Sequence, residues 1–228
     1  MKKISKMNEL AWVLGIFLCA LGIALYIKAG FGLSMVAAPP YLIHLKMVEV
    51  FPWYTQGTSE YVLQTVLLII LCVIIKRVKL NFILSFVTAI ISGVVLDFWL
   101  FILGGGDVYE TMVVRVLAFI LGEISVSMAI AFFFKTALPL QSYEVFVKEI
   151  AGYFNIEISK IKMAFDISFL ILSVGLAVFL NRSLKGIGIG TVILTVINAP
   201  LINMFGKLFD KIFVFDMAFP KLEKILSK

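Results

Sequence analysis

The sequence LAWVLGIFLCALGIALYIKAGFGLSM spans residues 10–35 and contains the pattern that the later part of the chain repeats. Its first eighteen residues contain no charged side chain, and Lys28 ends the run. A helix needs about 20 mostly apolar residues to cross a membrane. The run is too long for the hydrophobic region of a signal peptide, and no persuasive cleavage site follows it. We therefore interpret it as a retained first membrane helix, followed by a glycine-containing turn.

The composition of the whole chain agrees with this interpretation. The 228 residues are 62% hydrophobic and 15% charged, with a mean hydropathy of +1.08. Soluble domains contain about 25% charged residues, and a domain of this size could not bury so large an apolar excess. A soluble, disordered or fibrous protein is thereby excluded. Cys19 and Cys72 both lie inside apolar runs, so neither a disulfide nor a metal site is indicated.

Hydropathy predicts six membrane spans and two shorter apolar segments. The short segments are Leu33–Leu45 and Leu140–Tyr153, which contain too few residues to cross. Pro39 and Pro40 are expected to break helical bonding in the first of them. We expect both to be half-helices or interfacial helices. The predicted spans are roughly Leu10–Lys28, Tyr61–Ile75, Phe82–Leu103, Met112–Phe134, Lys162–Leu180 and Gly188–Phe205. The second is short, and we expect it to extend backward through Ser59.

The distribution of basic residues predicts the topology. With six spans, fifteen of the twenty Lys and Arg residues fall on the side of the N-terminus and five on the other side. Basic residues collect on the cytoplasmic side, so both termini are expected in the cytoplasm. This also explains the net charge of +6 without nucleic acid as a partner. The tail from Leu208, with Ile212, Phe215 and Phe219, is expected to lie along the inner membrane surface as an amphipathic segment.

The chain repeats itself with a period of about half its length. Ala11–Met35 and Ala118–Ser142 share seven of 25 residues at an offset of 107. A second pairing, at an offset of 106, places Ser92 opposite Asn198. Because each half holds three spans, the second half would enter the membrane from the opposite side. We predict an all-α membrane protein of two inverted three-helix repeats, residues 1–106 and 107–228, that form one membrane domain.

The repeat places two lysines at equivalent positions. Lys28 and Lys135 each end the first helix of a half and precede a short apolar segment. The start of a short helix carries free N–H groups and the positive end of the helix dipole. A lysine beside it would favour a carboxylate or a phosphate, although snorkelling to the headgroups is an alternative. Ser34 and Gln141, at matching positions, are expected to cap these helix starts.

Polar side chains within the predicted spans are further candidates for solute binding. Glu123 lies near the middle of the fourth span and Asp97 in the outer half of the third, while Ser92 and Asn198 add neutral polarity. Buried charges in spans are costly and often functional. Glu123 could carry a proton or receive a cation, or it could form a structural bond with a neighbouring side chain.

Two motifs resemble a known family. The stretch Gly22–Ser34, which ends in the turn from Lys28, resembles the signature of the YczE/YyaS/YitT-type bacterial integral membrane proteins. Gly188–Ile193, followed by Ala199–Ile202, is similar to the family's late Gly-Thr helix. The chain departs from the family where Met35-Val36-Ala37 replaces a Pro-Trp-Asp-like sequence, and where Leu138-Pro139-Leu140 replaces a glycine-rich turn. The resemblance implies a multi-pass protein of the bacterial cytoplasmic membrane. It supplies no substrate, because the family is largely uncharacterised.

These observations lead to one main functional expectation and two alternatives. We expect a small secondary transporter for an anionic or zwitterionic solute, with no cofactor and no enzymatic activity, because the sequence holds no nucleophile–base pair, metal cluster or nucleotide motif. The substrate-binding subunit of an ATP-driven importer is the first alternative. Ala11, Gly15 and Cys19 would then form a docking face for a partner subunit. A non-transporting accessory or immunity protein is the second, and a homodimer is compatible with each.

Overall fold

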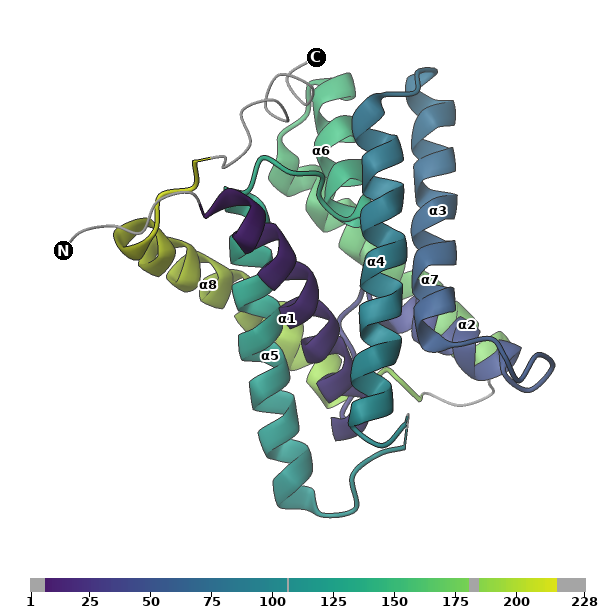
Figure 1. Ribbon diagram of the computed structural model, residues 1–228. Helices are drawn as coiled ribbons and strands as arrows, with labels where there is room; N and C mark the ends of the chain where they lie inside the picture. The colour runs from purple at the N-terminus through teal and green to yellow at the C-terminus, as the bar shows by residue number, and fades with distance from the viewer. Residues whose placement is uncertain (1–6, 106, 181–184, 217–228) are drawn as a thin grey trace.

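The computed structural model describes residues 7–105, 107–180 and 185–216, which form eight helices (Figure 1). Two of them are short and the other six are long and apolar enough to cross a membrane. The helices are α1 (Asn8–Ala29), α2 (Ala38–Met47), α3 (Gln56–Ile75), α4 (Leu80–Ile102), α5 (Met112–Lys135), α6 (Ser142–Phe154), α7 (Ile158–Phe179) and α8 (Ile189–Ile212).

The six predicted spans are confirmed, and local signals fix several of their ends. Gly30 ends α1 in the left-handed conformation, with φ of 66°, and its N–H donates to the carbonyl of Tyr26. At the start of α3 the hydroxyl of Thr55 accepts a hydrogen bond from the N–H of Thr58 at 3.0 Å. The predicted span in this region was Tyr61–Ile75 with an extension backward through Ser59, and the structure starts the helix three residues earlier, at Gln56.

Both short segments are helical, and the expected effect of the proline pair is wrong. Pro39 and Pro40 lie in the first turn of α2 and do not break it. A proline is tolerated there because its missing N–H would have no partner inside the helix. The second short segment becomes α6, which begins directly after Gln141.

The centre of the molecule is the crossing of α1 and α5 (Figure 1). A Cβ atom built on Gly22 would lie 2.7 Å from the carbonyl oxygen of Gly122, so neither position has room for a side chain. Gly15 faces Phe133 of α5 at a similarly short range. Ala11 shares a buried cluster with Ala131 and Phe132 of α5, and Cys19 is buried close to Gln141, before α6. The expected docking face for a partner subunit is therefore covered by other parts of this chain.

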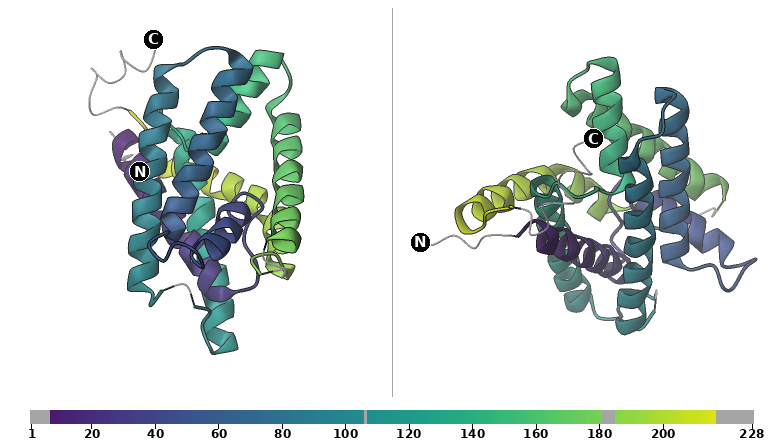
Figure 2. Two further views of the ribbon diagram at one scale, coloured as in Figure 1. Left: turned by 90° about the vertical axis from the view of Figure 1, so that its right-hand side faces the viewer. Right: turned by 45° about the horizontal axis from the view of Figure 1, so that its top comes forward.

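The remaining long helices surround this crossing unequally. On one side α3 and α4 lie side by side, and α6 packs on both of them (Figure 2). On the other side α8 packs on α5. The helix α7 packs on α2 and α6, on the side of α3, where Phe165 and Phe169 share a buried cluster with Leu67 of α3. Figure 1 shows α8 running away from α7 toward the N-terminal side of the molecule. Only 17% of the α8 span is buried, compared with 39% of the α4 span.

The expected amphipathic tail differs from the structure. Leu208 and Ile212 belong to α8, which continues through Pro200 as one helix to its end at Ile212. Its last turns pack inward, because Phe209 is buried and stacks on Phe132 with ring centroids 4.1 Å apart. Phe215 follows the helix, and Phe219 lies outside the described residues.

Candidate functional site

The start of α6 lies beside the middle turns of α3 and α4. The side-chain amide of Gln141 donates to the hydroxyl of Ser92 at 3.2 Å, and the backbone N–H of Ser142 donates to Oε1 of Gln64 at 3.1 Å. Ser92 and Gln64 both lie near the centres of their helices. The connection from α5 to α6 therefore brings a helix N-terminus to the middle of two spanning helices, where backbone and side-chain polar groups converge.

A polar stripe on α3 faces this helix start. Gln56, Glu60 and Gln64 follow one another at intervals of four residues, which places them on one face of the helix, and each is at most 3% exposed. Oε1 of Glu60 accepts hydrogen bonds from the hydroxyl of Tyr143 at 2.9 Å and from Nε2 of Gln64 at 3.2 Å. Among the described residues, Oε2 of Glu60 and both amide atoms of Gln56 have no hydrogen-bond partner.

A second polar stripe runs along α4. Ser85, Thr88 and Ser92 are at most 5% exposed. The hydroxyl of Thr88 lies 3.3 Å from the carbonyl of Pro139, in the connection to α6, whereas the hydroxyls of Ser85 and Ser142 have no partner in the described part of the chain. We call Glu60, Gln64, Ser92, Gln141, Ser142 and Tyr143 the mid-helix cluster.

A pocket of about 110 Å³ lies next to this cluster. Its lining includes Ser85 of α4 and Leu140, the neighbour of Gln141. Lys148 and Glu149 of α6 also line it, and Glu149 pairs with Lys79 at the start of α4. The pocket therefore lies between the first turns of α4, the connection before α6 and the middle of α6, and none of the six cluster residues lines it.

Glu144 adds a second carboxyl group to the first turn of α6. Burial raises its pKa above the ordinary value, and the charge of Lys162 on α7 opposes the shift. Its Oε2 atom has no hydrogen-bond partner among the described residues. The first turn of α6 thus holds an open hydroxyl, that of Ser142, and an open acidic oxygen.

Glu123, the deepest charge predicted from the sequence, belongs to a different contact. The hydroxyl of Tyr26 on α1 donates to its Oε2 at 2.6 Å, and the hydroxyl of Ser127 donates to its Oε1 at 2.9 Å. Both carboxyl oxygens therefore have a donor, and the group lies 2% exposed at the α1–α5 crossing. This geometry matches the structural bond that the sequence left open as an alternative.

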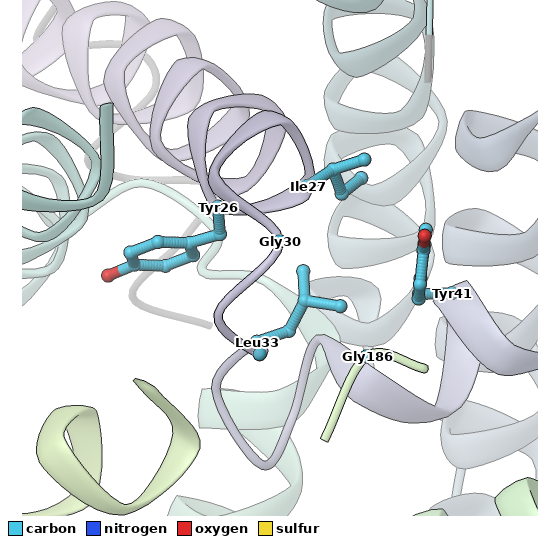
Figure 3. A pocket seen from close by; sticks show the side chains of 7 residues that line it. Tyr26, Ile27, Gly30, Leu33, Tyr41 and Gly186 are labelled. Carbon is cyan, nitrogen blue, oxygen red and sulfur yellow. The ribbon is translucent and has the colours of Figure 1, made fainter. Parts of the chain in front are cut away.

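The two motifs that resembled a family pack against each other. The N–H of Leu33 donates to the carbonyl of Gly186 at 2.9 Å, and the N–H of Gly190 donates to the carbonyl of Phe31 at 2.9 Å. Figure 3 shows the side chain of Leu33 beside Gly186, with Tyr41 across a pocket of about 20 Å³. A pocket of this size holds about one water molecule.

Two cationic side chains lie next to the turn after α1. Nε of Arg115 donates to the carbonyl of Ala29 at 2.7 Å, and its guanidinium lies 4.7 Å from the centroid of the Phe31 ring. The ammonium of Lys28, a residue that is 4% exposed, lies 4.7 Å from the centroid of the Tyr109 ring. In the described residues, no carboxylate lies within 4.0 Å of this ammonium. Lys28 is a buried cation next to the turn and lies apart from the mid-helix cluster.

Three other predicted residues have hydrogen-bond or ion-pair partners elsewhere in the structure. Asp97 accepts a hydrogen bond from the N–H of Gly57 at 2.7 Å and so satisfies the start of α3. Lys135 pairs with Asp210 of α8 at 2.6 Å. Ser34 accepts from the N–H of Ala37 at 3.4 Å at the start of α2.

The cap expected from Gln141 is wrong, and Asn198 has an open acceptor. Gln141 occupies the position before α6, but its side chain does not cap the helix and reaches Ser92. Oδ1 of Asn198 is buried without a partner among the described residues. Of the predicted set, the structure therefore brings Gln141 and Ser92 together, while the others lie in separate contacts.

Comparisons with known proteins confirm the family resemblance. A model described as "Family of unknown function (DUF6198)" matches residues 6–207. The chain is 24% identical over 212 residues to a protein of Bacillus subtilis (strain 168) named "Uncharacterized protein YyaS"; the alignment covers 91% of this chain and 96% of that protein. No solved structure matches the chain. Neither description states an activity, so a function has to be argued from the residues.

Proposed function

We propose that this chain, which belongs to the family of unknown function DUF6198, is a small secondary transporter for an anionic or zwitterionic solute. The observation that carries the proposal is the start of α6 beside the middle of α3 and α4, among buried polar groups with open hydrogen-bonding positions. Half-helices that begin near the midplane form the solute sites of many secondary transporters.

The chemistry of this helix start favours a solute with an anionic group. The first N–H groups of a helix and the positive end of its dipole attract carboxylates and phosphates. The buried, open hydroxyl of Ser142 is a second donor at the same place. An unpaired buried polar group costs about 1–3 kcal/mol. A solute that fills these positions would recover that cost, whereas a purely structural core gains nothing from leaving them open.

The order of the helices supports an inverted repeat. Each half consists of a span, a short helix and two further spans, and several contacts occur in equivalent pairs. The contact of α3 with α6 corresponds to that of α7 with α2, and α1 with α4 corresponds to α5 with α8. The α4 contacts with α3 and α6 have no comparable counterpart around α8 within the described ranges.

This asymmetry suggests how the transporter would alternate between two states. In the proposed cycle, α8 packs onto α7 and α2 while α4 separates from α3 and α6. The two halves thereby exchange conformations. Gln141 and Ser92, which are hydrogen-bonded in this structure, have Ser34 and Asn198 as their repeat equivalents. The second state would bring Ser34 and Asn198 together, and the open oxygen of Asn198 would find its partner there.

The proposal divides the candidate residues into three groups. Gln141 and Ser92 would bind the solute in the described arrangement, and Ser34 and Asn198 in the other. Lys28 would attract the anion at the turn after α1. We assign structural roles to the remaining three, Asp97, Glu123 and Lys135, because each has partners that account for its charge or its position.

Thermal unfolding of the purified protein with added solutes tests the proposal. The probes are lactate, succinate, phosphate, glycine and alanine. A solute at 100 times its Kd stabilises the folded state by about 2.7 kcal/mol. We expect a shift with at least one probe that is lost in Gln141→Ala and kept in Lys46→Gln, which changes an exposed ion pair at the end of α2. No shift with any probe, or a shift that survives in Gln141→Ala, would contradict the proposed site.

A further inference from the structure

We infer that Glu60 is the proton carrier that couples solute movement to the proton gradient. The inference deepens the proposed function and rests on it. Glu60 lies in the second turn of α3 and is 3% exposed. Gln64 connects it to the proposed solute site, because the Gln64 amide donates to Glu60 and accepts from the N–H of Ser142.

The hydrogen bonds of Glu60 have the arrangement of a neutral carboxyl group. Both donors, Tyr143 and Gln64, reach the same oxygen, Oε1, which then serves as the carbonyl oxygen. The other oxygen, Oε2, has no partner in the described part of the chain and is the one that would hold the proton. Glu123 differs, since its two oxygens each receive one donor, as suits a carboxylate.

The surrounding charges do not compensate a negative Glu60. The titratable groups that face α3 from the helices around it are Tyr143 and Glu144 of α6, Asp97 of α4, Cys19 of α1 and His44 of α2. Within the described ranges, no Lys, Arg or His nitrogen lies within 4.0 Å of the Glu60 carboxyl group. A buried carboxylate without a counter-ion is costly in a low dielectric, so the described arrangement holds Glu60 in its protonated form.

The proton on Glu60 would also form a hydrogen bond with the solute. In the protonated state, the O–H on Oε2 of Glu60 is an open donor, and the start of α6 supplies further donors at Ser142. A proton that enters from one side binds the Glu60 carboxylate, and the neutral carboxyl then donates to the anionic oxygen of the solute. After the exchange of states, the solute leaves and the proton dissociates to the other side. No covalent bond of the solute changes, and one proton crosses with each solute molecule.

Infrared spectroscopy of the protein in liposomes tests whether Glu60 holds the proton. We expect the wild-type minus Glu60→Gln spectrum at pH 7 to contain a protonated-carboxyl band that shifts in D₂O. Glu123→Gln is the matched control, because it removes a carboxyl group of similar burial, and the Glu60 band should remain in it. If the Glu60→Gln difference spectrum shows only carboxylate bands, the inference is overturned.

Transport by the same liposomes tests the coupling. With lactate, succinate and glycine as probes, an inward proton gradient of one pH unit should drive up to about tenfold accumulation of a solute that crosses with one proton and no net charge. Glu60→Gln should lose this accumulation but keep solute exchange without a gradient, whereas Glu123→Gln should keep both.

The outcomes separate the two claims. Gradient-driven accumulation by Glu60→Gln at the wild-type level would overturn the role of Glu60 while the transporter proposal stands. Absence of movement of every probe in all three proteins would overturn the proposed function and the coupling role with it. The infrared band would still decide whether Glu60 is protonated.

Discussion

Replacing Gly93 with alanine should weaken the contact between α3 and α4. A Cβ atom on Gly93 would lie 2.6 Å from the carbonyl oxygen of Gly57, whereas ordinary contacts begin at 3.4 Å. The helices would have to separate by about 0.8 Å, and the 2.7 Å hydrogen bond from Gly57 to Asp97 would stretch with them. Overpacking of this kind costs about 1–3 kcal/mol, against a gain in helix propensity of about 0.5–1 kcal/mol. We expect net destabilisation of about 1–2 kcal/mol.

Thermal unfolding in detergent measures this effect, with Gly175→Ala as the matched control. Gly175 lies inside α7, and a Cβ atom there meets nothing within 4 Å. The control should therefore gain stability from helix propensity alone. For a chain of this length, 1 kcal/mol corresponds to about 2–4 °C in Tm. If Gly93→Ala were as stable as Gly175→Ala, the close contact of α3 with α4 in the described arrangement would be refuted.

Three further predictions concern the surroundings of the site. Burial lowers the pKa of His44, so its contribution to stability is full above about pH 6.5 and is lost as the pH falls through the folded-state pKa. His44→Gln should therefore reduce the drop in Tm at acidic pH, and an unchanged pH profile would contradict this. Arg115→Lys loses the fork that contacts the carbonyls around Gly30 and should destabilise the protein by about 1–2 kcal/mol in denaturant unfolding, whereas full stability would show the fork to be dispensable. Tyr26→Phe leaves one oxygen of Glu123 without its donor and should cost about 1–3 kcal/mol, with a smaller loss in a Glu123→Gln background; equal losses in a double-mutant cycle would argue against the bond.

Most of the fold could be predicted because long apolar runs and their boundaries determine membrane helices. All six spans and both short helices followed from hydropathy. The errors came from features that depend on position in three dimensions. A proline interrupts a helix when it lies in the interior but is tolerated in the first turn, where Pro39 and Pro40 lie. Composition alone does not distinguish these two cases. Leu208 and Ile212 resemble an amphipathic surface segment, but the burial of Phe209 keeps them in α8.

The site was harder to predict because its parts are far apart in the sequence. Gln141 and Ser92 were both identified, but their pairing depends on where the connection after α5 lies in space. Glu60 lay within the backward extension of the second span but was not identified as a candidate, because its partner Tyr143 comes 83 residues later in the sequence. The four-residue spacing of Gln56, Glu60 and Gln64 was a signal that could have identified a buried polar face on α3.

The exchange of two packing arrangements is the central claim, and cross-linking in liposomes tests it most directly. In a protein with Cys19→Ala and Cys72→Ser, the pair Ser34→Cys and Asn198→Cys is treated with a short bifunctional thiol reagent. The pair Ser34→Cys and Met163→Cys, with its second position on the exposed face of α7, is the control. We predict that the first pair cross-links in a fraction of molecules, that a bound solute changes this fraction, and that the control pair does not react. If the first pair never cross-links while the protein is folded, the second arrangement does not form and the account is contradicted.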